Sequence, residues 1–377
     1  MRTLIMNGLV YRNESRGFAP MDILIEDGAI AALGNGISAV DARIIDAKGK
    51  RIVPGLVDVH THGICGYDFL IADEKALQEM AVAYCEHGVT CVMPTLASAP
   101  LEEMLSAAKR IKELCATKGA QLCGVHIEGR YLNPQKRGAH AIELLSALSP
   151  EELCRFEELS LSMLHISAAF ELDKDKSFAK KALEIGATLS LGHTAASYAE
   201  AVECERAGVS AYTHLYNAMP PLNHRDGGAV SACLLGNAFA ELICDGIHIS
   251  PEVVALTYSV KRDKLALISD SMEATCCEDG EYSIAGNPVT VTDGIARTHD
   301  GALAGSTLTL DAAVRNLMRF CKIPLEDAII CATEAPAREI GVFESVGSID
   351  IAKRADMLIL GEGDFEIEQV FTARDFI

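Results

Sequence analysis

The sequence is short of positive charge, and this shortage excludes one large class of partner. It contains 33 Lys and Arg residues against 53 Asp and Glu residues, which gives a formal net charge of -20. No segment gathers Lys and Arg into the basic patch that a nucleic-acid-binding protein presents to phosphate groups. We therefore expect no nucleic-acid partner, and any phosphorylated ligand must be held by a local cationic pocket.

The chain also lacks the hydrophobic runs of a membrane protein. No stretch reaches the ~20 uncharged apolar residues that are needed to span a bilayer. The first residues, Met1 to Asn7, are followed by Gly8 and polar residues, which is unlike the apolar core of a signal peptide. We expect a cytoplasmic protein with no membrane partner.

The 13 cysteines show no pattern of paired bridges. Their number is odd, and Cys91, Cys123, Cys244 and Cys331 lie inside apolar runs, where buried reduced thiols are common. The adjacent Cys276-Cys277 lacks a second cysteine pair at zinc-site spacing, so we do not expect a structural zinc there.

No low-complexity segment or solenoid repeat is found in the 377 residues, a length that suits one large domain plus a small appendage or two medium domains. In the first fifty residues, short apolar segments alternate with turn signals such as Asp27-Gly28, a pattern typical of antiparallel strands. The C-terminal tail shows the same pattern. We predict that residues 1–53 and 345–377 form one small β-sandwich domain, and that residues 54–344 form the main domain.

Eight near-continuous apolar runs follow one another in the main domain. A near-continuous apolar sequence is typical of strands that are covered on both faces. A closed (β/α)8 barrel requires eight such strands. The sequence thus predicts an α/β fold, a TIM-like barrel with a small β-sandwich domain built from both chain ends. The runs are 56–60, 90–95, 122–128, 161–169, 188–193, 211–215, 240–245 and 265–270.

The segments between these runs carry helix signals. Ser149–Glu152 and Ser197–Glu200 each place a capping Ser three residues before a Glu. Gly88, Gly186 and Gly208 each precede an apolar run directly, and Gly readily adopts the left-handed turn that ends a helix. These glycines predict tight loops at the end of the barrel opposite the expected catalytic residues.

Acid and imidazole side chains end five of the eight runs, and catalytic groups of such barrels come from strand C-termini. Two histidines one residue apart on a strand point to the same face, here the barrel interior. A Glu in an apolar barrel needs a compensating cation. This set is typical of catalytic zinc with an open position for water. The candidate ligands are His60, His62, Glu128, His193 and His214.

Simpler interpretations stay open for these residues. Arg130 could neutralise Glu128, His126 could only support the site, and a single His at a strand end such as His193 is often a satisfied core residue. Asp270, which closes the eighth run, could cap a following helix. Its position favours a general base that takes a proton from the attacking water and later protonates a leaving amine.

Together these residues resemble the amidohydrolase superfamily and, within it, the N-acetylglucosamine-6-phosphate deacetylases. The resemblance extends over nearly the whole chain. The motif around His60 marks only the superfamily, whereas His214–Met219 and Asp245–His248 are far more specific to the deacetylases. The matching segments are Val53–Gly63, His126–Gly129, Gly192–Thr194, Thr213–Met219, Asp245–His248, Ser269–Met272 and Leu303–Ser306.

The resemblance implies hydrolysis of the acetamide of N-acetylglucosamine 6-phosphate by metal-activated water, with Asp270 as the acid/base. It implies that Glu128, His193 and His214 hold the principal metal and that His60 and His62 could hold a second one. We expect one or two divalent ions per subunit. Zinc is favoured, and iron, manganese and cobalt also accept these ligands.

The resemblance also implies a homodimer whose partner subunit contributes to the substrate pocket. Arg225 and His248 would face the phosphate, and His140 would polarise the acetyl carbonyl. Alternatively, Arg225 could be a loop arginine paired with Asp226, and the two histidines could be ordinary loop residues. The implied substrate contacts are Ala139, His140, Asn217, Ala218, Arg225, His248, Leu303, Ala304 and Gly305.

Two positions depart from the family pattern, because Arg130 and Gly227 stand where the family has proline. Arg130 could recognise a second anionic group, and Gly227 gives its loop more freedom. Three rival functions follow: another amidohydrolase, such as a cyclic amidase or an N-acyl amino-acid deacylase; a deacetylase for a related amino-sugar phosphate; and a non-catalytic scaffold. The full set of inward-facing ligands argues against the last, since buried charges are costly without a metal.

Overall fold

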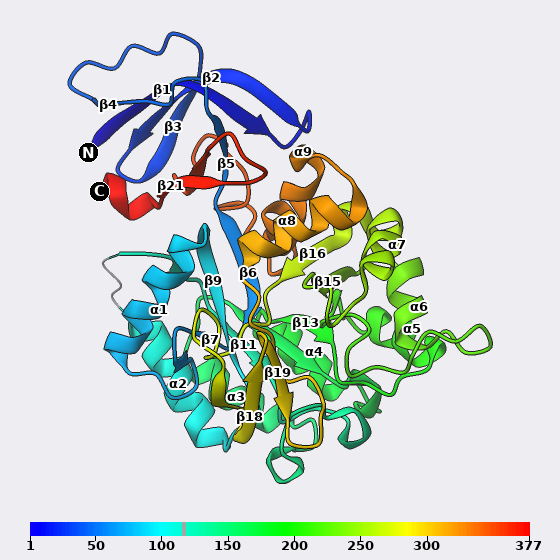
Figure 1. Ribbon diagram of the computed structural model, residues 1–377. Helices are drawn as coiled ribbons and strands as arrows, with labels where there is room; N and C mark the ends of the chain where they lie inside the picture. Colours follow the sequence, from blue (N-terminus) through cyan, green and yellow to red (C-terminus); the bar gives the residue numbers. More distant parts are fainter. Residues whose placement is uncertain (115–117) are drawn as a thin grey trace.

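The computed structural model describes residues 1–114 and 118–377, and its main body is a nearly closed parallel barrel (Figure 1). Each predicted apolar run overlaps one barrel strand, so the predicted (β/α)8 barrel is confirmed. The Asp270 N–H donates to the His60 carbonyl at 2.9 Å, which joins the last strand to the first. The strands, in their order around the barrel, are β6 (Leu56–Thr61), β9 (Val89–Leu96), β11 (Val125–Glu128), β12 (Leu164–Ala168), β13 (Thr188–Leu191), β14 (Ala211–Tyr212), β15 (Phe239–Ile243) and β16 (Leu265–Ile268), and the short β10 (Gln121–Leu122) pairs with β9.

One helix follows each barrel strand. The capping predictions are confirmed: Ser149 and Ser197 accept the backbone N–H groups of Glu152 and Glu200. No helix in the described part of the chain is long and apolar enough to cross a bilayer. The helices are α1 (Glu74–Glu86), α2 (Leu101–Glu113), α3 (Pro150–Glu158), α4 (Ser177–Glu184), α5 (Tyr198–Arg206), α6 (Gly228–Leu235), α7 (Pro251–Lys261) and α8 (Leu310–Cys321).

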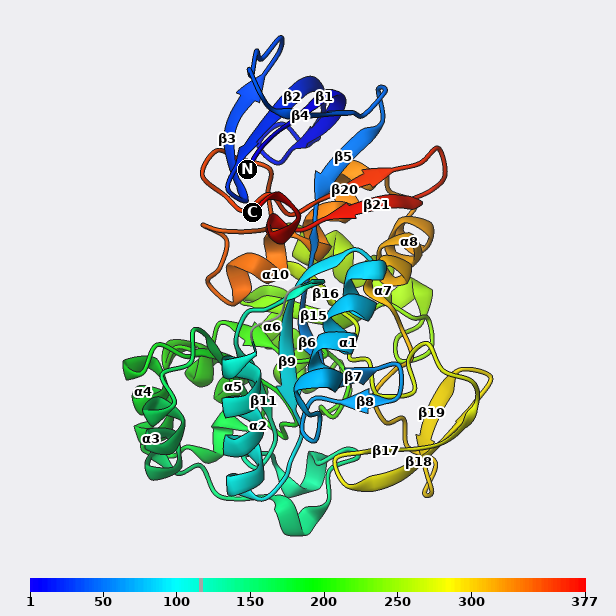
Figure 2. The same ribbon diagram turned by 90° about the vertical axis from the view of Figure 1, so that its left-hand side faces the viewer.

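The two chain ends share one sheet at the end of the barrel away from the strand C-termini (Figure 2). β5 pairs in parallel with β1 and antiparallel with β20, so this sheet joins the first fifty residues to the C-terminal tail. Its apolar side chains form a core separate from that of the barrel, with Ile5, Ile23, Met357 and Phe376 among its members. The strands are β1 (Arg2–Arg12), β2 (Gly17–Glu26), β3 (Ala29–Gly34), β4 (Arg43–Asp46), β5 (Arg51–Pro54), β20 (Met357–Leu360) and β21 (Ile367–Phe371).

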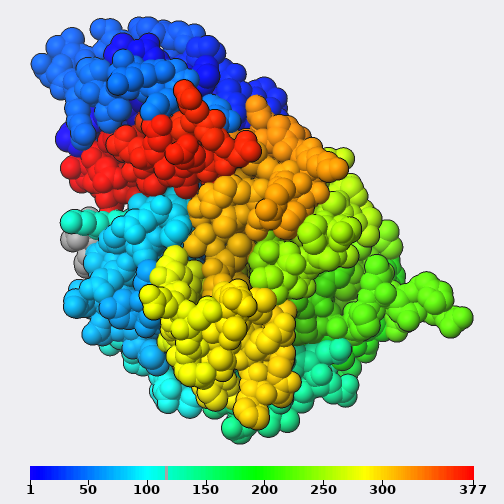
Figure 3. Space-filling view, in the orientation of Figure 1, coloured from blue at the N-terminus to red at the C-terminus, as the bar shows by residue number. Residues whose placement is uncertain are grey.

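Smaller elements decorate the barrel. A three-stranded antiparallel sheet, which the sequence analysis did not predict, lies between β16 and α8 and covers the front of the molecule in Figure 3. Two short helices follow α8. These elements are β7 (Gly63–Ile64), β8 (Tyr67–Asp68), β17 (Gly280–Ile284), β18 (Asn287–Thr292), β19 (Ile295–Thr298), α9 (Leu325–Ala328), α10 (Glu334–Glu339) and the 3-10 turns Pro134–Lys136, Ile142–Leu144, Phe170–Leu172, Arg262–Lys264, Ile329–Ala332 and Ala373–Phe376.

An ion pair links the first and last helices of the barrel. His87 caps the end of α1, and its Nδ1 lies 3.3 Å from Oδ1 of Asp311 in the first turn of α8. Contacts with Asp311 and Cys276 raise the pKa of His87 to about 10. The imidazolium is therefore stabilised in the folded protein.

We expect His87→Gln to destabilise the protein most at mildly acidic pH. Because the folded-state pKa of His87 is raised above its ordinary value of 6.5, its contribution is complete below about pH 6.5 and is lost as the pH rises toward 10. Urea unfolding of both proteins from pH 5.5 to 10 should show a difference of about 1 kcal/mol that shrinks with rising pH. A difference that grows with pH would contradict this assignment.

Candidate active site

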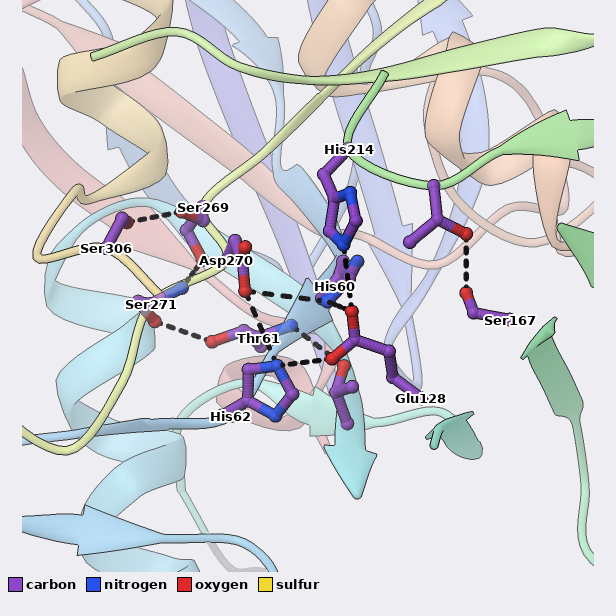
Figure 4. A network of polar contacts seen from close by, with 12 residues as sticks. His60, Thr61, His62, Glu128, Ser167, His214, Ser269, Asp270, Ser271 and Ser306 are labelled. Atoms are coloured by element: carbon purple, nitrogen blue, oxygen red, sulfur yellow. Dashed lines mark hydrogen bonds and ion pairs between the residues drawn. The ribbon is translucent and has the colours of Figure 1, made fainter. Parts of the chain in front are cut away.

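Six buried side chains converge at the C-terminal ends of the barrel strands. Figure 4 shows all of them except His193 with labels. The Nε2 atoms of His193 and His214 each lie 3.0 Å from Oε1 of Glu128 and 3.0 Å from each other. Nε2 of His62 lies 3.0 Å from the other oxygen of the same carboxylate. The six residues, which come from five strand ends, are His60, His62, Glu128, His193, His214 and Asp270.

Glu128 lies between two groups of potential ligands. On one side are His193 and His214, and on the other are His60, His62 and Asp270. Asp270 Oδ1 lies 3.5 Å from Nε2 of His60 and 3.4 Å from Nε2 of His62. The Glu128 carboxylate therefore has one oxygen near each group, a placement that suits either one ion or two bridged ions.

The hydrogen bonds around the rings leave the inward-facing nitrogens free. His60 Nδ1 lies 2.9 Å from Glu241 Oε2, and His193 Nδ1 lies 2.9 Å from the Lys136 carbonyl. Donation to these acceptors places the ring protons on Nδ1, so both Nε2 atoms present a lone pair to the site, as metal-ligating histidines do. His60 Nε2 is buried without a hydrogen-bond partner. Imidazoles prepared in this way, together with a carboxylate, fit a divalent cation.

Burial and charge set the ionisation of this cluster. Burial lowers the pKa of His193 to about 4, so the ring is neutral, which is the form that binds metals. Although burial opposes ionisation of Glu128, the surrounding imidazoles, that of His60 foremost, hold its pKa well below its usual range. The site thus combines an ionised carboxylate with a neutral imidazole.

Three of the converging residues occupy the left-handed backbone region. The φ angles are 47° at His193, 31° at His214 and 48° at Asp270. Each such residue costs about 1–3 kcal/mol and persists only where the surrounding structure holds it, which is common at functional sites. These turns aim the three side chains across the barrel mouth.

A cavity of about 280 Å³ opens above the cluster. Eight of the nine residues that the sequence analysis assigned to substrate binding line this cavity. Ile284 and Ala285, from the β17–β18 hairpin, close one side of it. The cavity lining includes no Lys or Arg among the described residues. The eight are Ala139, His140, Asn217, Ala218, His248, Leu303, Ala304 and Gly305.

The two cavity histidines that the sequence analysis assigned to substrate are fixed in orientation. His140 Nδ1 accepts the backbone N–H of Ser98 at 3.3 Å, so its proton lies on Nε2, which is 3.6 Å from Glu128 Oε2 and faces the cluster. His248 Nδ1 lies 2.6 Å from Asp245 Oδ2. A neutral His140 can therefore donate a hydrogen bond to an oxygen bound beside Glu128.

Arg225 is not brought into the cavity of its own chain. It lies on a fully exposed loop, residues 221–226, which projects from the side of the barrel in Figures 1 and 3. The alternative pairing with Asp226 is not seen, because no carboxylate of the described residues lies within ion-pair distance of the guanidinium. Instead, the backbone N–H of Arg225 donates to Asn223 and Asp226 accepts from Gly228.

Arg130 does not neutralise Glu128. Its guanidinium pairs with Glu152 through two hydrogen bonds of 3.2 and 3.1 Å and donates a third to the Ala99 carbonyl. Its φ is 62°, a conformation that the proline ring forbids. The departure from the family pattern thus reflects a local turn held by Glu152, and the guanidinium is already occupied.

Sequence reasoning missed Glu241, which orients His60 from the middle of β15. The available signal was a single charged residue inside an otherwise apolar run, which in a barrel strand requires a buried partner. His126 was expected at most to support the site. Its two ring nitrogens contact Thr95 and Ser167 at 3.1 and 2.7 Å, which leaves neither free for a metal.

Known proteins share this arrangement. The model of the amidohydrolase family matches residues 51–373. The chain is 34% identical to an N-acetylgalactosamine-6-phosphate deacetylase of Escherichia coli O157:H7, over 92% of each chain. It is 32% identical to an N-acetylglucosamine-6-phosphate deacetylase of Vibrio furnissii, over 92% of this chain and 88% of that protein.

Solved structures agree with this relationship. N-acetylglucosamine-6-phosphate deacetylase from Pasteurella multocida superposes with a TM-score of 0.92 at 27% identity, covering 99% of this chain and 98% of the other. A mutant of the Mycobacterium smegmatis enzyme in complex with N-acetyl-D-glucosamine-6-phosphate gives 0.89 at 26% identity, with the same coverage. With a matching family model over most of its length, the chain belongs to the amidohydrolase family.

Proposed function

We propose that this protein is a metal-dependent deacetylase that hydrolyses N-acetylglucosamine 6-phosphate to glucosamine 6-phosphate and acetate. The observation that carries the proposal is the convergence of Glu128, His193 and His214 at 3.0 Å on the floor of the cavity. The deacetylases among the relatives supply the substrate class.

Glu128, His193 and His214 would hold the principal ion, and His60 and His62 a second one. These residues would hold an ion that, when bound, would polarise the amide carbonyl and make water a stronger nucleophile. We favour zinc, because an imidazole and carboxylate set with an open position is typical of catalytic zinc. Iron, manganese and cobalt accept the same ligands.

The chain's own groups perform the remaining steps. Asp270 takes the proton from the attacking water and passes it to the amine as the carbon–nitrogen bond breaks. The Nε2–H of His140 donates to the oxygen of the acetyl group as negative charge develops on it. The loop of Leu303, Ala304 and Gly305, with Asn217 and Ala218, packs around the sugar.

A second candidate substrate is N-acetylgalactosamine 6-phosphate, which the E. coli relative is named for. Acetate release from both phosphorylated sugars and from their unphosphorylated forms, with each metal added in turn, decides between them. We expect the larger kcat/KM for the glucosamine derivative and little hydrolysis without phosphate. Equal hydrolysis of plain N-acetyl sugars, N-acyl amino acids or cyclic amides would contradict the proposal.

We further propose a homodimer in which Arg225 of each chain reaches the cavity of the other. Among the described residues, no guanidinium or ammonium group lines the cavity of one chain to meet a phosphate, and Arg225 has no ion-pair partner on its projecting loop. Since the net charge of -20 repels anions, a local cation is required. The unpaired cysteines of the described residues also support a reducing, cytoplasmic location.

Arg225→Ala should raise KM for the phosphorylated sugar about 10–100-fold, since a charge-assisted hydrogen bond is worth about 1.5–3 kcal/mol. Arg206→Ala, on the exposed face of α5, is the control. Mixing Arg225→Ala chains with inactive Asp270→Asn chains should restore about one quarter of wild-type activity, because half of the dimers carry one intact site. No recovery in verified mixed dimers would contradict the exchange of Arg225.

A further inference from the structure

A third group of metal-type side chains lies inside the barrel, below the cluster at its mouth. It consists of His165 on β12, Glu241 on β15 and Glu339 on α10, and one donor atom of each lies within 4.8 Å of the others. All three residues are buried: His165 and Glu241 are 0% exposed, and Glu339 is 2% exposed. Figure 2 places α10, the helix that contains Glu339, between the barrel and the sheet of the chain ends.

Two of the three side chains, His165 and Glu339, have ligand atoms without a hydrogen-bond partner. Nε2 of His165 and both carboxylate oxygens of Glu339 are buried without a hydrogen-bond partner. Buried polar groups in native proteins are almost always satisfied, so three such atoms in one place require an explanation. Two of these atoms belong to a carboxylate, whose burial is the more costly.

The basic side chains beside this pair of carboxylates are the imidazoles of His60 and His165, which both lie against Glu241. Among the described residues, no Lys or Arg lies within ion-pair distance of Glu241 or Glu339. Burial and the neighbouring charge of Glu241 raise the pKa of Glu339 well above its usual range. Two buried carboxylates this close cannot both ionise unless a cation lies between them, and without a cation a proton on Glu339 takes its place.

The geometry suits a cation. His165 Nε2 lies 3.4 Å from Glu241 Oε1 without forming a hydrogen bond. In a tetrahedral site with bonds of about 2.0–2.2 Å, the ligand atoms lie about 3.3–3.6 Å apart. His165 Nδ1 lies 2.7 Å from the Thr188 hydroxyl, and donation to it leaves the lone pair on Nε2. If Glu339 binds through both oxygens, the three side chains supply four donor atoms.

We propose that His165, Glu241 and Glu339 bind a structural divalent transition-metal ion, a site separate from the one at the barrel mouth. One imidazole and two carboxylates form a nitrogen and oxygen donor set that suits zinc, manganese or iron(II). An ion of charge +2 balances the two carboxylates. Because the ligands are closed to solvent, the ion enters during folding and exchanges slowly afterwards.

This group of side chains is connected to the cluster at the barrel mouth through Glu241. Glu241 offers one oxygen to this group and the other to His60, at 2.9 Å. The ion would hold the Glu241 carboxylate in place and so fix the ring of His60. The proposal does not depend on the deacetylase activity, since the three ligands lie outside the cavity.

The decisive measurement on the wild-type protein is an anomalous difference map at the zinc absorption edge, from crystals grown with zinc. We expect a peak between His165 and the two carboxylates in addition to the peaks at the mouth. Peaks at the mouth alone would overturn the proposal, whatever substrate the enzyme uses.

Glu339→Gln tests the same point in solution. After dialysis against EDTA, the wild-type protein and the control Glu334→Gln, which changes the half-buried acid at the start of α10, should each retain one more ion per chain than Glu339→Gln. Glutamine has the size of glutamic acid and can donate a hydrogen bond to Glu241. An unchanged ion count and melting temperature in Glu339→Gln would show a shared proton in place of the metal.

Discussion

Replacing Asp270 by Asn is expected to lower kcat by about 10³-fold while the fold and the metal content at the barrel mouth stay intact, since positioned acid/base groups typically contribute 10²–10⁴-fold. The carboxylate is 7% exposed and its Oδ1 faces His60 and His62. Asn retains the shape of the side chain but cannot accept the proton of water. Acetate release, metal analysis and circular dichroism on the same preparation measure the three quantities.

Asp173→Asn is the matched control for Asp270→Asn. Asp173 is also a buried carboxylate, but its oxygens accept the backbone N–H groups of Phe178 and Ala179 in α4, away from the cavity. We expect turnover close to that of the wild type. Near-normal turnover in Asp270→Asn itself would remove Asp270 from the role of acid/base.

Glu128→Gln is expected to have a different signature, with loss of both the metal at the mouth and the activity. The carboxylate of Glu128 lies within 3.0 Å of His62, His193 and His214, so one substitution removes the negative charge that both groups of ligands share. Without it, the imidazoles repel a divalent ion that they would otherwise hold. We expect kcat/KM to fall by about 10⁴-fold, the scale of several kcal/mol of lost metal assistance.

Metal content separates the two variants. Asp270→Asn should contain as much metal at the mouth as the wild type, and Glu128→Gln should contain none there. The control Glu171→Gln changes a carboxylate that is also buried but accepts hydrogen bonds from Asn133 and Ala195 outside the cluster, and should keep its metal. Full metal content and turnover in Glu128→Gln would contradict the central position of this residue.

The barrel was predictable from the sequence because its physical requirements are local. A parallel strand covered on both faces must be apolar along its length, so a run such as Leu265–Ile268 can be recognised in the sequence. The ligands could be placed because each ends one of these runs, as Glu128 and Asp270 do. The cavity residues came from the resemblance, since Ala139 or Gly305 carry no chemical signal of their own.

What could not be predicted depends on distances between remote segments. Glu339 and Glu241 are separated by nearly a hundred residues, and nothing in the pattern around either one indicates the other. The β17–β19 sheet was missed because the search followed near-continuous apolar runs, whereas β18 alternates buried Val289 and Val291 with exposed Thr290 and Thr292. The position of Arg225 depends on how far its loop projects, which local sequence does not encode.

The sheet of the chain ends has a consequence for synthesis of the protein. β5 is translated early, but its antiparallel neighbour β20 comes from residues 357–360, so this edge of the sheet stays open until translation is nearly complete. A chain that stops before Met357 would contain every ligand at the mouth and still expose an unpaired strand edge, which invites aggregation. Nascent chains of this protein should therefore depend on chaperones until the last few dozen residues leave the ribosome.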